Sequence, residues 1–397
     1  MGADLGPSVN GRPDEVDAWG TNRRSPLIPG RLLVHADLHN HTLISDGAGE
    51  PELAYESMRN SGLDVAAVTD HLWTTEGGKV FARSSQGLDD EGWLRLQEIV
   101  EKSDVPGSFV ALRGFEWSDS TLGHINVWFS QSFVAPRREA RHMMGELWDW
   151  MTHGPESESA LASFNHPGGR GTSRFSDFQY RPALRDRVVG LEMFNKLDDY
   201  LLEGTDLGQP SPLVQCLSKG WMPGLIGVSD EHGDNWGVPV GKGRTGLWVK
   251  ELTAEGVWEA LTRRACFATR EKGVRLAVAL RCGPHLAEMG GVVDDCAGPA
   301  EVDVDVELGR RWAGKELMLE VLAPGPLVPS VASDRSVVLG PRGDLQTTLD
   351  PFPLSDWAVL RVSDPSAAGD RRGVRLPLSP GRSIAYSSPI WRKQRDG

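Results

Sequence analysis

The chain has 397 residues, 39% of them hydrophobic and 24% charged, and its formal net charge is −13. So long a chain needs more than one ordinary hydrophobic core, and the composition is that of a globular protein. The negative charge repels a phosphate backbone and argues against a nucleic-acid scaffold as a partner. It does not exclude a small anionic substrate, because bound metal ions would dominate the charge inside a pocket.

The sequence shows no clear pattern for membrane insertion, secretion or a disulfide framework. No stretch approaches the ~20 apolar residues of a membrane span, and the first residues contain no apolar run of signal-peptide length. The four cysteines form no Cys-x-x-Cys pair and are too few for a disulfide framework: Cys216, Cys266, Cys282 and Cys296. We therefore expect reduced thiols and a cytoplasmic protein with no membrane partner. The oligomeric state is left open.

The chain divides into three regions. Residues 1–30 are rich in Gly, Pro, Asp, Asn and Arg without periodicity, which predicts an irregular N-terminal arm. Between 31 and 272, short apolar runs typical of buried strands occur at 32–36, 65–68, 109–112, 125–129, 161–164, 188–194 and 225–228. Helical patterns lie between or after them at 50–62, 93–99, 143–151 and 253–264. This alternation indicates parallel strands joined by helical crossovers, with a site at the strands' carboxyl ends.

The pattern changes beyond residue 273. Apolar residues alternate with period two at 274–280, 302–306 and 317–321, and clusters of Gly and Pro separate these runs. Such alternation is typical of antiparallel strands with one buried face. The sequence thus predicts a small β-rich C-terminal domain over 273–397. We expect it to shape a pocket or an oligomer and to supply no metal ligand.

Potential metal ligands gather at the strand ends of the first domain. His39 and His41 are two residues apart, so on an extended chain both imidazoles point to one side. Six of the chain's ten histidines and three carboxylates occupy such positions: His39, His41, Asp46, His71, Glu116, His124, His166, Asp230 and His232. Imidazole with carboxylate suits Zn, Mn or Fe, and the lack of cysteine argues against a closed structural zinc site. The set predicts roughly two to three divalent ions.

These segments, in this order, resemble the PHP superfamily, named for polymerase and histidinol phosphatase. The resemblance covers about residues 32–270 and rests on Glu116 and on Asp37-Leu38-His39-Asn40-His41-Thr42, Ser45-Asp46-Gly47, Thr69-Asp70-His71, Gly123-His124, Asn165-His166-Pro167 and Ser229-Asp230-Glu231-His232-Gly233. Gly114-Phe115-Glu116-Trp117, Gly123 to Val127, Thr253 to Thr269 and the closing Ala385 to Trp391 are similar more particularly to CehA/McbA-type metallohydrolases.

The resemblance implies an α/β fold: a distorted (β/α)7 barrel followed by a β-rich region, with a trinuclear metal centre. Carried over to this chain, the first ion would be held by His39, His41, Glu116 and Asp230. Glu116 would bridge to a second ion, completed by His124 and His166. The third would be held by Asp46, His71 and His232, and many family members have histidine where this chain has Asp46.

The expected function is metal-dependent hydrolysis by a hydroxide between two ions, with Glu116 at its centre. A small phosphoester is the preferred substrate, because several ions can bind its non-bridging oxygens together. Carbamate, ester or amide hydrolysis is the alternative. A non-hydrolytic biosynthetic metalloenzyme and a metal-binding module without turnover also stay open.

Residues beside the ligands supply the remaining predictions. Asp70 is expected either to orient a ligand or shuttle a proton, or to be a structural hydrogen-bond partner. Arg170 and Arg174 follow the His166 segment and are candidates for binding an anionic substrate, or are solvated loop residues. Asn195 ends a strand as a substrate or ligand-supporting candidate. Three tryptophans are assigned either to the core or to a pocket for an aromatic leaving group: Trp117, Trp128 and Trp236.

Overall fold

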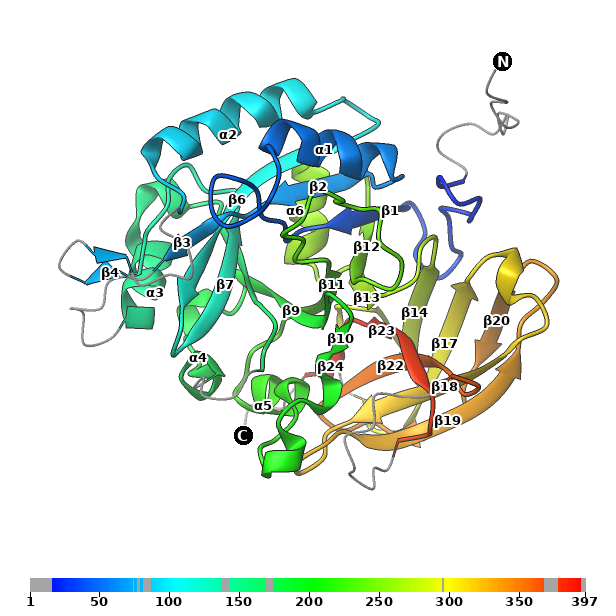
Figure 1. The fold of residues 1–397 in the computed structure, drawn as a ribbon. Helices are drawn as coiled ribbons and strands as arrows, with labels where there is room; N and C mark the ends of the chain where they lie inside the picture. Colours follow the sequence, from blue (N-terminus) through cyan, green and yellow to red (C-terminus); the bar gives the residue numbers. More distant parts are fainter. Residues whose placement is uncertain are drawn as a thin grey trace, which may run out of the picture.

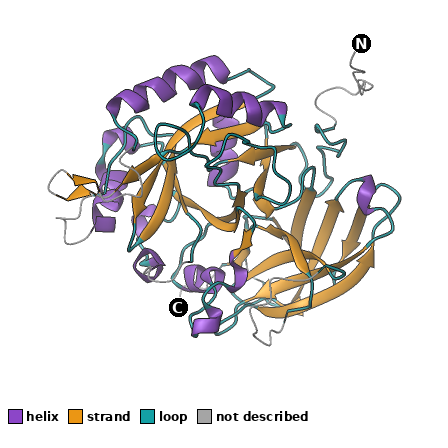
Figure 2. Ribbon diagram, viewed as in Figure 1, coloured by secondary structure: helices purple, strands orange, loops and turns teal. Residues whose placement is uncertain are grey.

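The structure, a computed structural model, describes residues 16–73, 75–76, 79–80, 87–136, 143–168, 174–294, 296–367 and 378–393. It is a mixed α/β molecule with a β-rich C-terminal part (Figure 1). Helices gather around the first part of the chain, whereas the C-terminal part is almost entirely strand (Figure 2). None of the helices in the described ranges has the length and apolar character needed to cross a membrane.

The helices α1, α2, α3 and α6 match expected positions because their start and stop signals are local, whereas α4 and α5 were not predicted. The helices are α1 (Pro51–Asn60), α2 (Asp90–Ser103), α3 (Met143–His153), α4 (Arg174–Phe178), α5 (Pro212–Ser218) and α6 (Ala254–Thr262). Proline opens α1, and the Thr253 side chain caps α6 by accepting a hydrogen bond from the Gly256 amide. The segment α4 is a left-handed turn, since Phe175 has φ 58° and ψ 42°.

The described strands of the first part include every predicted run and six that were not predicted: β3, β4, β5, β10, β12 and β13. The strands of this part are β1 (Leu32–Asp37), β2 (Val65–Val68), β3 (His71–Trp73), β4 (Thr75–Glu76), β5 (Lys79–Val80), β6 (Val110–Asp119), β7 (Gly123–Trp128), β8 (Leu161–Phe164), β9 (Val188–Asn195), β10 (Asp198–Asp199), β11 (Gly224–Val228), β12 (Arg244–Val249) and β13 (Cys266–Thr269). β1 pairs with β2, β2 with β6, β8 with β9, and β9 with β11, all parallel.

The pairing departs from the expected alternation in the middle of this sheet. β6–β7 and β7–β8 are antiparallel. Residues 120–122 join β6 to β7, and so short a connection cannot return the chain for a parallel partner. The sheet therefore differs from a regular (β/α)7 barrel. Its two ends still meet beyond β1 and β11, where the His41 amide donates to the Glu231 carbonyl at 2.9 Å and the Asp230 amide to the His39 carbonyl at 3.0 Å.

The C-terminal part is formed mainly by antiparallel strands, as its period-two pattern predicted, and β16 pairs with β24 in parallel. The strands of this part are β14 (Arg275–Cys282), β15 (His285–Glu288), β16 (Val292–Val293), β17 (Pro299–Glu307), β18 (Glu316–Ala323), β19 (Ser330–Val338), β20 (Asp344–Thr348), β21 (Phe352–Pro353), β22 (Trp357–Asp364), β23 (Arg382–Ser387) and β24 (Ile390–Arg392). One sheet runs β15–β14–β17–β20, and β19–β18–β22–β23 faces it across a shared apolar core. β23 also pairs with β13, so backbone hydrogen bonds cross from one part to the other.

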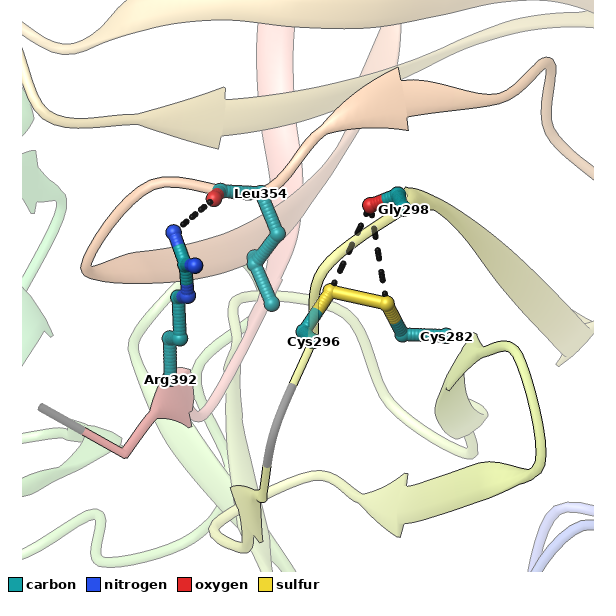
Figure 3. Close-up of a disulfide and its surroundings, with 5 residues drawn as sticks. All are labelled: Cys282, Cys296, Gly298, Leu354 and Arg392. Atoms are coloured by element: carbon teal, nitrogen blue, oxygen red, sulfur yellow. Dashed lines mark hydrogen bonds between the residues drawn. A yellow bond between two sulfur atoms is a disulfide. The ribbon is translucent and has the colours of Figure 1, made fainter. Parts of the chain in front are cut away.

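Cys282 and Cys296 form a disulfide, with Cα atoms 5.5 Å apart (Figure 3). The expectation of reduced thiols is wrong for this pair. β17 pairs antiparallel with β14 and places Ala300 opposite Cys282, so Cys296, just before β17, reaches Cys282. Cys216 and Cys266 are free and buried. Because disulfides are uncommon in a reducing cytoplasm, the bridge counts against the predicted location, which stays a prediction.

The described part of the N-terminal arm packs onto both parts of the molecule. Asp17 Oδ2 lies 2.9 Å from the buried Nε2 of His35, and Arg23 pairs with Asp64 at 2.7 Å. Ser25 donates a hydrogen bond to Asp305 on β17. Residues 16–31 are thus fixed by polar contacts that composition alone did not indicate.

Candidate metal centre

The two histidines after β1 lie side by side as their spacing predicted. Both are fully buried, and their Nε2 atoms are 3.0 Å apart. The extended backbone continues past Asp37 by pairing with the segment after β11, which keeps both imidazoles on one face. The spacing of His39 and His41 in the sequence therefore predicts how these two ligands are arranged.

Glu116 lies at the centre of the cluster. Its buried carboxylate is 2.6 Å from His71 Nδ1, and Oε1 lies 3.2 Å from both His39 Nε2 and His124 Nδ1 and 3.3 Å from His166 Nε2. Four imidazoles from separate segments thus surround one carboxylate. A carboxylate has two oxygens with several lone pairs, so it can bridge neighbouring cations.

We expected Glu116 to end its strand, but the structure places it inside the strand. β6 continues to Asp119, and β7 begins at Gly123. In the β6–β7 register, Ser118 is opposite His124 and Glu116 is opposite Asn126, so alternation places Glu116 and His124 on the same face. The antiparallel turn, rather than a parallel strand end, brings His124 to the site.

Asp230 joins the His39–His41 pair from the segment after β11. Its Oδ1 is 3.2 Å from His41 Nε2, 3.6 Å from His39 Nε2 and 3.3 Å from His232 Nδ1. Asp230 has a positive φ of 47°, which is unusual for a residue other than glycine and is often found at functional sites.

Asp46 lies beside a different pair of histidines. Its Oδ1 is 3.6 Å from His71 Nε2 and 3.4 Å from His232 Nε2. This oxygen is buried and has no hydrogen-bond partner among the described residues, and the same holds for His124 Nδ1. Unpaired buried polar atoms are costly, and a cation held by the group to which each atom belongs would satisfy it.

The structure brings all nine predicted ligands together in four overlapping groups. In each group the ligand atoms lie within 4.8 Å of one another: His39, His41 and Asp230; His39, Glu116 and His166; His71, Glu116 and His124; and His41, Asp46, His71 and His232. Nitrogen and oxygen donors at this spacing fit divalent cations such as Zn, Mn or Fe. Within the described ranges, no group includes a residue from the C-terminal part.

The charges of the cluster favour a cation. Burial by itself would raise the pKa of the Glu116 carboxyl, but His124, His71 and His39 hold its pKa well below its usual range. For Asp230, burial is likewise outweighed by His39 and His41, and its pKa is also well below normal. The pKa of His41 is lowered by burial and by the neighbouring His71. Two ionised carboxylates thus face an imidazole that resists protonation.

Glu192 belongs to the site and was missed by the sequence analysis. It is fully buried on β9, its Oε1 accepts a hydrogen bond from His39 Nδ1 at 2.8 Å, and its Oε2 accepts one from the His166 amide at 2.6 Å. A carboxylate behind a histidine fixes the ring and raises its basicity as a ligand. A signal was present, since Glu192 is the one charged residue of the apolar run 188–194.

Asp70 and Asn195 contact the groups that support the cluster. Asp70 accepts hydrogen bonds from the Thr42 amide at 2.8 Å, the Thr42 hydroxyl at 2.7 Å and the Ser45 hydroxyl at 2.5 Å. Asp70 therefore shapes the turn between His41 and Asp46. These contacts favour the prediction that Asp70 is a structural hydrogen-bond partner. Asn195 donates from Nδ2 to Glu192 Oε2 at 2.9 Å and so acts through that carboxylate.

The arginines predicted to bind substrate receive little support. Arg170 lies outside the described residues. Arg174 borders a small cavity of about 70 Å³ that also exposes His124 and His166. Its guanidinium, however, donates to the carbonyls of Glu203 at 2.6 Å and Pro210 at 2.7 Å. These contacts fix the peptide around 203–210 and direct the charge away from the nine ligands.

The three tryptophans proposed for a pocket belong to the core. Trp117, Trp128 and Trp236 are each at most 1% exposed. A different tryptophan reaches the site: Trp73 at the end of β3 stacks on His71, with ring centroids 3.9 Å apart. Sequence reasoning overlooked it because Trp73 stands beyond the Thr69-Asp70-His71 motif.

Comparison with known proteins gives likenesses among solved structures only. No family model and no curated protein matches the chain. Among solved structures, it is similar to a two-domain protein from Bacteroides vulgatus ATCC 8482 described as containing a predicted PHP-like metal-dependent phosphoesterase. The two share 18% identity over 92% of this chain and 97% of that chain, with a TM-score of 0.48. At this level the likeness assigns neither fold nor function to this chain.

Proposed function

We propose that the chain is a metal-dependent hydrolase of the PHP superfamily, with the architecture of the CehA/McbA-like subgroup, and that it cleaves a small phosphoester. The observation that carries the proposal is the position of Glu116, with four histidine nitrogens between 2.6 and 3.3 Å from its carboxylate. Imidazole nitrogens and carboxylate oxygens at this spacing are the donors that a divalent cation would bind together.

The ions and the residues around them would have separate roles. Roughly two to three divalent ions, when bound, would supply Lewis acidity and lower the pKa of a water molecule. Glu116 would hold two of the ions, because it belongs to two of the four groups. Glu192 would orient His39 and the His166 backbone, and Asp70 would keep the turn carrying Asp46 in place.

Phosphoester cleavage is favoured because several cations together can bind the non-bridging oxygens of one phosphoryl group, which a planar carbonyl does not require. One observation favours the second candidate, an ester or carbamate with an aromatic leaving group. The Trp73 ring stacked on His71 offers a flat apolar wall beside the cluster.

The test combines metal analysis with paired substrates. Protein grown with added Zn, Mn and Fe is expected to carry roughly two to three ions per chain and to hydrolyse p-nitrophenyl phosphate. 1-Naphthyl acetate and 1-naphthyl carbamate serve as the neutral comparison. His285→Ala, in the C-terminal part, is the control for histidine replacement. Less than one ion per chain would overturn the proposal, and turnover of the neutral esters alone would replace the phosphoester with the second candidate.

A further inference from the structure

Lys196 places a positive charge against the cluster from its solvent side. It follows β9, and its Nζ lies 3.2 Å from Asp230 Oδ2. The other carboxylate oxygen of Asp230 faces His41 and His232. Lys196 and these two imidazoles therefore contact different oxygens of the same carboxylate. The Lys196 side chain is nevertheless 47% exposed.

One of the partly exposed ligands, His232, contacts the same Asp230 carboxylate as Lys196. The side chains of His39, His41 and Glu116 are completely covered. His166 and His232 are partly exposed, at 24% and 30%, and Lys196 is the most exposed group in contact with a candidate ligand of this set. A substrate entering from solvent would therefore meet the Lys196 ammonium beside the open ligands.

The backbone around Lys196 is held in an uncommon conformation. Its φ is 52°, in the left-handed region that residues with a side chain seldom adopt. Its carbonyl accepts a hydrogen bond from the Gly243 amide at 3.1 Å. Gly243 allows this approach, because a Cβ there would lie 2.4 Å from the Val228 carbonyl oxygen and 2.6 Å from that of Phe194. Strained backbone that neighbours enforce is concentrated at functional sites.

The C-terminal part fixes the hairpin that carries Lys196. β9 and β10 pair antiparallel, with Asp198 opposite Asn195. The next residue, Asp199, accepts a hydrogen bond from the Tyr386 hydroxyl at 2.9 Å, and Tyr386 lies on β23. Burial raises the pKa of Tyr386 well above its ordinary value, so the hydroxyl keeps the proton that it donates.

We propose that Lys196 binds an anionic oxygen of the substrate at the mouth of the cluster, and that Tyr386 positions the hairpin for this role. An ammonium has three N–H donors, and the contact with Asp230 uses one. The others can reach a phosphoryl oxygen that the ions leave uncovered. This inference rests on the proposed function and narrows it, because a neutral ester offers Lys196 no charge to bind.

The test measures inorganic phosphate binding by calorimetry to metal-loaded protein, with metal content determined on the same samples. Lys196→Gln is expected to weaken phosphate binding by about tenfold or more, since a charge-assisted hydrogen bond is lost. Lys196→Arg should stay within about threefold of wild type, because it keeps the charge. Lys102→Gln removes a lysine paired only with Glu98 on the surface of α2 and should change nothing.

A second pair of variants tests the positioning by Tyr386. Tyr386→Phe should weaken phosphate binding by about threefold without changing metal content or turnover of 1-naphthyl acetate. Tyr55→Phe, which removes another buried hydroxyl bonded to the Leu112 carbonyl, is the matched control.

Three outcomes would overturn the inference: no phosphate binding by the metal-loaded wild type, unchanged phosphate affinity in Lys196→Gln, or loss of metal in that variant. Loss of metal would mean that Lys196 only supports Asp230. A wild-type protein without metal would instead overturn the proposed function and this inference together.

Discussion

Two buried glutamates show how differently the two parts of the molecule balance charge. Glu116 on β6 and Glu320 on β18 are both fully buried. Glu116 is surrounded by imidazoles, whereas Glu320 pairs with the guanidinium of Arg361 and accepts a hydrogen bond from the Ser379 amide. Elsewhere in the C-terminal part, Arg275 pairs in the same way with Asp305 and Glu307.

The two parts differ in whether the groups that face the buried carboxylates carry a permanent positive charge. Arginine stays charged at every working pH, so the carboxylates of the C-terminal part are balanced by the chain itself. Histidine changes its charge near neutral pH, and neutral imidazole is also the form that binds metal. We therefore expect the Glu116 cluster to need an external cation, whereas the arginine–carboxylate pairs of the C-terminal part need none.

Replacing Glu116 by alanine should give the largest effect on activity. Glu116 belongs to two of the four groups, so both lose a ligand. Because each ion contributes several kcal/mol to a hydrolytic transition state, turnover should fall by about 10³-fold or more. Turnover of p-nitrophenyl phosphate and metal content per chain are the measurements. A Glu116→Ala protein with wild-type metal content would contradict the assignment.

Replacing Glu320 by alanine should affect stability without affecting metal. It leaves the buried Arg361 without its carboxylate, which typically costs about 3–5 kcal/mol of the free energy of unfolding. Urea unfolding of metal-free protein measures this cost. Glu316→Ala, at an exposed position of the same strand, is the control and should stay within about 0.5 kcal/mol. Loss of metal in Glu320→Ala would break the distinction between the two parts.

Removing metal should destabilise the wild type more than Glu116→Ala, because that variant keeps only the two groups without Glu116. At a free concentration of 100 times Kd, each ion adds about 2.7 kcal/mol to the free energy of unfolding. Thermal unfolding with and without EDTA should therefore show a lower Tm in EDTA. An identical Tm in both conditions would mean that the carboxylates of the first part are balanced without an ion.

The smallest effect is expected for Asp46→Ala. Asp46 belongs to a single group and is partly exposed, so its loss leaves the Glu116 groups intact. Turnover should fall by about tenfold, equivalent to ~1.4 kcal/mol. Asp294→Ala, which removes an exposed carboxylate paired with Lys393, provides the control. If Asp46→Ala were less active than Glu116→Ala, the central role of Glu116 would be wrong.

Local sequence patterns predicted much of the fold and the candidate ligands. The spacing of His39 and His41 fixed their common face, and the Thr253 cap fixed the start of α6. β12 and β13 were missed. Only three residues separate β13 from α6, so its apolar residues adjoin the helical pattern. The predicted ligands Asp230 and His232 were found because they directly follow a buried strand.

The sequence by itself determined which residue types stand at which strand ends, because periodicity and caps act over a few neighbouring residues. Only the tertiary structure decided which of them meet. The antiparallel register of β6 and β7 brought His124 to Glu116, β9 carried Glu192 behind His39, and the pairing of β17 with β14 brought Cys296 to Cys282. It also turned Arg174 toward backbone carbonyls and set Lys196 against Asp230. Such contacts depend on strand register and connection length over large sequence separations, which no local pattern encodes.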